Sequence, residues 1–139
     1  MVHIMILADD DSKELYKLIL KLEARGYFIT KIISPDVSSN SFKESLNALE
    51  PEDYLLCVGE SVNSGISVLE HKLRSIEAAF FVVNNPCNFS GSLKAKKIFL
   101  YGNDEAEKLG DNLDLEAFTD DDLDVLLEEV LIDIISLEH

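Results

Sequence analysis

The sequence contains few residues that could cross-link a small fold or interrupt its helices and strands. Its 139 residues include two cysteines, three prolines, six glycines and no tryptophan. Cys57 and Cys87 have neither a metal-ligand spacing nor the pattern of a disulfide framework, and the histidines His3, His71 and His139 are scattered. We therefore expect neither a zinc site nor a disulfide scaffold. A single domain of this length can instead be held by its hydrophobic core.

Positive charge and long apolar runs are also scarce. Lys and Arg number 12 against 27 Asp and Glu, which gives a net charge of −15. This field repels nucleic acid and anionic membranes, and the nearest approach to a basic cluster is Lys94, Lys96 and Lys97. Apolar runs such as 78–83 are far too short to span a membrane, and the first residues show no signal peptide. We expect a cytoplasmic protein that binds neither nucleic acid nor membrane, and we interpret the acid-rich segment 104–124 as a solvated face.

The hydrophobic pattern alternates between strand and helix along the chain. Continuous apolar runs predict strands buried on both faces, and stripes at i, i+3, i+4 and i+7 predict amphipathic helices. The predicted strands are 2–8, 27–33, 54–58, 78–83 and 98–101, and the predicted helices are 11–25, 41–50, 66–76, a short one between 84 and 97, and 119–134. This alternation implies right-handed crossovers between parallel strands.

We therefore predict one α/β domain over residues 1–136. Its architecture is a three-layer α/β/α sandwich with a five-stranded parallel sheet in the flavodoxin-like order 2-1-3-4-5. The ending Leu137-Glu138-His139 resembles the stub of a purification tag and is left out of functional reasoning.

Polar residues predict where the helices begin. Asp11 and Glu14 have the spacing of a capping box at the first helix, and Ser41 and Glu44 have it at the second. Thr119, followed by three aspartates, is predicted to begin the last helix, because acids favour the positive end of the helix dipole.

A binding site is expected beyond the carboxyl ends of the strands, near the switch point between the first and third strands. Polar loops should converge on that edge, at 9–11, 34–41, 59–65, 84–92 and 102–104. The 59–65 loop matches neither a Walker loop nor a dinucleotide motif, but its glycines and serines at a helix start could hold an anion. An ordinary helix-entry turn is the alternative. The candidate ligand-binding residues are Gly59, Glu60, Ser61, Asn63, Ser64, Gly65, Asn84 and Asn85.

Three adjacent aspartates at the end of the first strand suggest a metal site. Carboxylates at a strand end can bind Mg²⁺ while water completes the octahedron. Because Asp11 is assigned to capping, Asp9 and Asp10 are the candidate metal ligands. The alternative is that these acids only end the strand and cap the helix.

The opening segment 6–11, its following helix and Gly26-Tyr27 resemble the start of a response-regulator receiver domain. Segment 53–58 followed by 65–69 resembles the third strand and third helix start of that family, so the resemblance covers roughly residues 3–83. In receivers an acid pair, here Asp9 and Asp10, holds Mg²⁺, and an aspartate ending the third strand accepts a phosphoryl group.

Several receiver positions differ in this chain. The phosphoacceptor position falls at Cys57 or Val58. The hydroxyl expected after the fourth strand is replaced by Asn84 or Asn85, and the lysine expected after the fifth falls near Tyr101-Gly102. The resemblance therefore implies a degenerate receiver that works by contacts.

A second resemblance is to TIR domains. Ser61-Val62-Asn63-Ser64, followed by Glu70, is similar to the segment after their third strand. In enzymatic members a glutamate there assists NAD cleavage, and a carboxylate can stabilise an oxocarbenium-like transition state. The alternative is that Glu70, beside His71 and Lys72, is a surface residue.

Three functions remain open from the sequence. The first is a non-catalytic, receiver-like regulatory or protein-interaction module whose partner is another protein or a second copy of the chain. The second is a small-molecule or nucleotide-binding protein that uses the loops at the carboxyl edge of the sheet. The third is a TIR-like NAD hydrolase. No catalytic residue is assigned for the first two, and Mg²⁺ is the one cofactor that the residues suggest.

Overall fold

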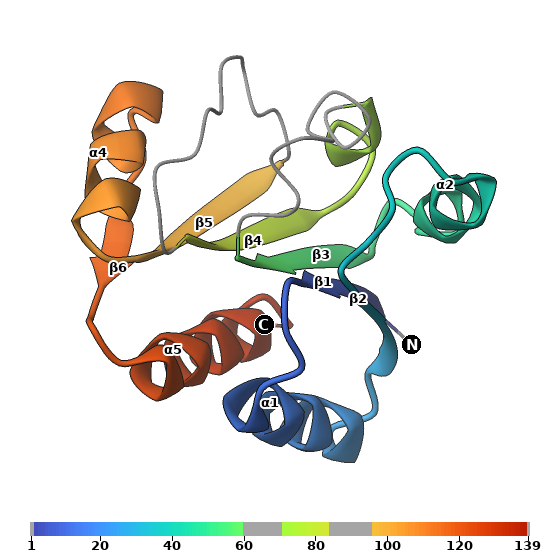
Figure 1. Ribbon diagram of the computed structural model, residues 1–139, viewed down its shortest axis with the longest axis horizontal. Helices are drawn as coiled ribbons and strands as arrows, with labels where there is room; N and C mark the ends of the chain where they lie inside the picture. Colours follow the sequence, from blue (N-terminus) through green and yellow to red (C-terminus); the bar gives the residue numbers. More distant parts are fainter. Residues whose placement is uncertain (1, 60–70, 84–95, 139) are drawn as a thin grey trace.

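The protein is a three-layer α/β/α sandwich around one parallel sheet (Figure 1). The computed structural model describes residues 2–59, 71–83 and 96–138. Six strands pair in the order β2-β1-β3-β4-β5-β6, and every pair is parallel. They are β1 (His3–Ala8), β2 (Phe28–Ile33), β3 (Tyr54–Val58), β4 (Ala78–Val83), β5 (Lys97–Gly102) and β6 (Ala117–Thr119). The predicted architecture and the order of the first five strands are confirmed, and the sixth strand is an addition at the β5 edge.

The three central strands are covered on both faces, as their apolar runs predicted. Every residue of β3 and β4 is buried, and so is every residue of β1 after His3. Alternate side chains enter two separate cores. Ile4, Ile6 and Ala8 point into one core, and Met5 and Leu7 point into the other. This is the pattern of a parallel sheet with helices on both sides.

The helices divide between the two faces. Helices α1 (Lys13–Ala24) and α5 (Leu123–Ser136) lie side by side beneath the sheet in Figure 1, and α2 (Asn40–Asn47) and α4 (Asp104–Leu113) lie above it. Residues 71–73 are also helical and lie within the predicted 66–76 helix, which ends three residues earlier than predicted. The remainder of that helix and the short helix predicted between 84 and 97 lie outside the described residues. None of the helices in the described part of the chain is long and apolar enough to cross a membrane.

The first two helices begin at serines other than the predicted capping residues. Ser12, rather than Asp11, caps α1, and its hydroxyl accepts a hydrogen bond from the Leu15 amide at 3.1 Å. Ser39, rather than Ser41, caps α2 in the same way and binds the Phe42 amide. Both the predicted and the observed residues carry a side-chain oxygen that can accept a hydrogen bond from a free amide of the first turn. The capping-box spacing alone therefore does not identify the capping residue.

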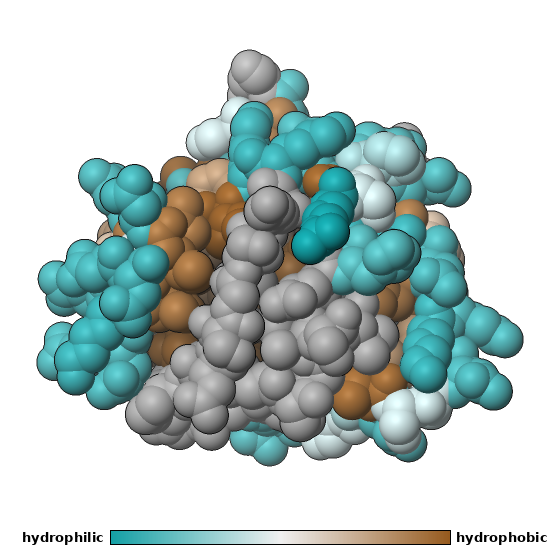
Figure 2. Space-filling view, turned by 90° about the horizontal axis from the view of Figure 1, so that it is seen from above, coloured by the Kyte–Doolittle hydropathy of each residue, from teal (hydrophilic) through white to brown (hydrophobic). Residues whose placement is uncertain are grey.

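The acid-rich segment 104–124 is more structured than a solvated face. Ala106, Leu109 and Leu113 form an apolar stripe, so the segment begins with the amphipathic helix α4, whose acids face outward. In Figure 2 hydrophilic side chains cover the left flank of the molecule, where α4 lies. Strand β6 follows, and Leu115 and Ala117 pack into the core that α4 covers.

The last helix begins at Leu123, four residues later than predicted, because Thr119 belongs to β6. The Asp120 carboxylate accepts a hydrogen bond from the Asp122 amide at 2.8 Å, which turns the chain out of the sheet. Asp122 then caps α5 by binding the Asp124 amide at 3.0 Å. The predicted use of acids at this helix start is correct, but the capping residue is the third aspartate.

Two glycines with positive φ provide a test of this backbone. Gly102 ends β5 with φ +155°, and a Cβ there would lie 2.0 Å from the Val83 carbonyl oxygen. Gly26 follows α1 with φ +94° and has open space around it.

We expect Gly102→Ala to lower the free energy of unfolding by about 3 kcal/mol, from overpacking and backbone strain together. Gly26→Ala should cost only about 1 kcal/mol, from strain alone. Urea unfolding of both variants measures the difference, and equal losses would contradict the packing at Gly102.

Candidate functional site

Hydrogen bonds connect the segments at the carboxyl ends of the strands along one edge of the sheet. The Ser34 amide binds the Ala8 carbonyl at 2.7 Å, and the Ser34 hydroxyl binds the Asp9 carbonyl at 3.0 Å. The Asp9 amide binds the Val58 carbonyl at 3.2 Å, and the Gly59 amide binds the Val82 carbonyl at 3.0 Å. The loops after β1, β2 and β3 therefore meet where the sequence predicted a site.

Asp9 occupies the space above Gly59. A Cβ on Gly59 would lie 2.3 Å from Oδ2 of Asp9, and Gly59 has φ +103°. Both the backbone conformation and the position of the carboxylate thus favour a residue without a side chain. Of the predicted metal ligands, the Asp9 carboxylate lies beside Gly59, whereas Asp10 is exposed.

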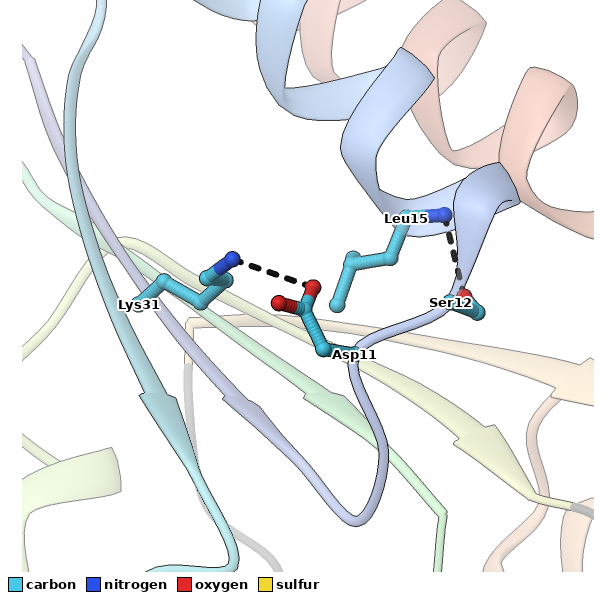
Figure 3. A network of polar contacts seen from close by, with 4 residues as sticks. All are labelled: Asp11, Ser12, Leu15 and Lys31. Carbon is cyan, nitrogen blue, oxygen red and sulfur yellow. Dashed lines mark hydrogen bonds and ion pairs between the residues drawn. The ribbon is translucent and has the colours of Figure 1, made fainter.

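Asp11 lies on the outer side of the loop and has a different role from the one predicted. Its carboxylate forms an ion pair with Lys31 of β2 at 3.0 Å (Figure 3). Ser12, the next residue, points the other way and caps α1. The pair is largely exposed, so it contributes little stability. It ties the β1–α1 loop to β2.

Neither residue at the receiver-like positions of β3, Cys57 or Val58, presents a reactive side chain at the end of the strand. Val58 packs into the core beneath α1 and α5, and Cys57 packs into the opposite core. Complete burial raises the pKa of the Cys57 thiol, so its sulfur stays protonated and unreactive.

The position after β5, where a receiver carries a lysine, is closed by packing. Tyr101 is buried and its hydroxyl donates a hydrogen bond to Asp133 of α5 at 2.6 Å. Gly102 is enclosed by the Val83 carbonyl and the Ala106 methyl group, so no longer side chain fits there. Neither residue presents a cation to the crevice.

Most of the predicted ligand-binding residues lie outside the described part of the chain. Of that set, the structure describes only Gly59. Glu60, Ser61, Asn63, Ser64, Gly65, Asn84 and Asn85 lie outside the described residues, as does Glu70, the candidate carboxylate of the TIR resemblance. The nucleotide-binding and NAD-cleaving hypotheses therefore stay predictions.

The described acids do not gather into a metal centre. Within residues 2–59, 71–83 and 96–138, no group of three or more His, Cys, Asp or Glu side chains is close enough to hold a metal ion. Because Glu60 lies outside these ranges, the Mg²⁺ hypothesis for Asp9 and Asp10 also stays a prediction.

Two hollows lie on the β5–β6 side of the molecule. One, of about 280 Å³, lies at the carboxyl edge between Asn103, Asp120 and Asp121. The larger, of about 410 Å³, lies along β5 and is called the β5 groove below. Its lining residues are Ile98, Phe99, Leu100, Tyr101, Glu116, Ala117, Phe118, Glu129 and Asp133.

The β5 groove was missed in the sequence because its residues come from three separate elements. The strand β5, the β6 segment and helix α5 each supply part of its wall. The Tyr101–Asp133 hydrogen bond that joins two of them spans 32 positions. The one local signal was alternation at 113–117, where apolar residues are separated by Asp114 and Glu116.

Comparison with models of protein families, with curated proteins and with solved structures finds no match to this chain.

The exposure of Asp10 leads to a test of the metal hypothesis. We expect millimolar Mg²⁺ to raise the melting temperature of the wild type and of Asp10→Asn by the same amount, because general screening of the −15 charge acts on both. NaCl at matched ionic strength is the control in a thermal-shift assay. A shift specific to Mg²⁺ that Asp10→Asn loses would contradict this expectation and establish Asp10 as a ligand.

Proposed function

We propose that this protein is a non-catalytic, receiver-shaped α/β domain that acts by binding a partner protein. The observation that carries the proposal is the contact between Asp9 and Gly59 at the end of β3. A phosphoacceptor would need a carboxylate at this strand end, but the receiver-like positions Cys57 and Val58 carry none and pack into the two cores. The Asp9 carboxylate already fills the space into which a side chain at position 59 would extend.

The surrounding positions support the same proposal. In-line phosphoryl transfer needs groups that neutralise charge on the transferred oxygens. By the receiver resemblance, the lysine that would supply such a charge falls near Tyr101-Gly102, and at Gly102 the neighbouring carbonyl of Val83 leaves no room for one. Neither Tyr101 nor Gly102 therefore supplies a cation at this edge of the sheet.

The exposed face of α1 offers a surface suited to a partner. Tyr16 and Leu20, one helical turn apart, are 57% and 49% exposed. Lys13 and Lys17 flank them on the same open surface, so apolar and basic groups alternate along the helix. Large apolar side chains that cluster on a surface, with charges at their rim, favour contact with another protein.

Phosphorylation chemistry tests the proposal. After incubation with acetyl phosphate and Mg²⁺, we expect the intact mass of the protein to stay unchanged, because Cys57, Val58 and Gly59, the described residues at the β3 end, carry no carboxylate that could accept the phosphoryl group. An adduct of one phosphoryl mass that hydroxylamine removes would identify an acyl phosphate and overturn the proposal. Asp9→Asn and Asp10→Asn, treated in parallel, would show whether either carboxylate carries it.

A further inference from the structure

Within the described part of the chain, strand β5 has an open edge along its first residues. It pairs with β4 over its whole length, from Lys97 opposite Ala78 to Gly102 opposite Val83. On its other side β6 joins only from Leu100 onward, in register with Ala117. Among the described residues, the segment 97–99 therefore has a neighbouring strand on one side only. Unpaired backbone groups on such an edge can accept an added strand.

The β5 groove lies along this edge, and the rings of Phe99 and Phe118 are among the side chains that line it. Phe99 stacks on Phe80 with ring centroids 4.8 Å apart, which fixes its ring in the wall. Phe118, from β6, is 38% exposed at the side of the groove. Helix α5 passes beneath this part of the sheet and supplies the opposite wall (Figure 1).

Carboxylates line the rim of the same groove. Glu129 and Asp133 come from successive turns of α5, and Glu116 directly precedes β6. Within the described part of the chain, no lysine or arginine forms an ion pair with any of the three. Burial and the nearby Asp133 and Glu129 raise the pKa of Tyr101, as expected where negative charge surrounds a partly desolvated group.

We infer that the β5 groove binds an extended, arginine- or lysine-bearing segment of a partner protein, which pairs with the open β5 edge. This inference rests on the proposed function as a protein-interaction domain. Backbone pairing with residues 97–99 gives the segment its direction and register. Its cationic side chains then reach the three carboxylates, and their aliphatic or guanidinium parts contact the rings of Phe99 and Phe118.

Charge and geometry favour this occupant over the alternatives. A second copy of the chain also carries −15, so the two surfaces would repel each other near the acidic rim. Nucleic acid is repelled for the same reason. An extended segment, unlike a helix, presents free backbone groups to a strand edge.

A designed peptide tests the inference directly. The probe is a fluorescent eight-residue peptide of alternating arginine and valine, measured by anisotropy with the full-length protein. We expect saturable binding that weakens as salt is added, because the contacts are charged and near the surface. A peptide with glutamate in place of arginine should not bind. Of two peptides methylated at alternate backbone nitrogens, one in each register, the peptide whose methylated nitrogens face the β5 edge should lose binding although its charge is unchanged, and the other should keep it.

Variants of the groove locate the binding. Glu116→Gln combined with Glu129→Gln should weaken the arginine peptide about tenfold, because two rim charges are lost while side-chain size is kept. The matched control is Glu107→Gln combined with Glu128→Gln. It removes the same charge from α4 and from the side of α5 that pairs with Lys21, away from the groove. We expect its affinity to stay within about twofold of wild type.

Three outcomes would overturn the inference. They are no binding of the arginine peptide, equal weakening by the groove and control variants, and full binding by both backbone-methylated peptides. None of these concerns phosphorylation, so the groove can fail while the proposed function stands. Conversely, a phosphoryl adduct on an aspartate would overturn the proposed function without explaining peptide binding. Circular dichroism of each variant confirms that the compared proteins are folded.

Discussion

Burial of the central strands on both faces is the constraint on which the rest of this structure depends. Strands β1, β3 and β4 are buried throughout, apart from His3 at the start of β1. Neighbouring parallel strands are joined by crossover connections, which are usually helices. These helices pack on the two faces of the sheet and bury its strands from both sides. The helices on both faces and the meeting of strand ends at one edge follow from this requirement. The site and its chemistry are then decided by which residues stand at that edge.

Much of the fold could be predicted from the sequence because long apolar runs and helical stripes are strong local signals. The strands from β1 to β5 and helix α5 are examples. Strand β6 was missed because its three residues are too few for a period of two to stand out, and two of them are exposed. Helix α4 was missed because its acids outnumber the apolar residues of its stripe. The cap of α1 was misplaced because Asp11 has a competing partner, Lys31, that lies on another strand.

The candidate site was predictable only in position. The strand order places Asp9 and Gly59 at the same edge, but the filling of the Gly59 space by a carboxylate depends on side-chain packing that no local pattern reveals. The same is true of the β5 groove. It exists because β6 begins opposite Leu100 rather than Lys97, and because Tyr101 binds Asp133 far along the chain. Local patterns predict elements, whereas these features depend on contacts between elements.

Amide hydrogen exchange, followed residue by residue by NMR, tests the central claim most directly. If double-sided burial holds the fold together, the amides of β1, β3 and β4 should exchange only through global unfolding and share one large free energy of opening. The amides of β6, a short edge strand with two exposed side chains, should open at much lower free energy. The contradicting result would be central strands that exchange as fast as β6, because the sheet would then not be the common support of both helical layers.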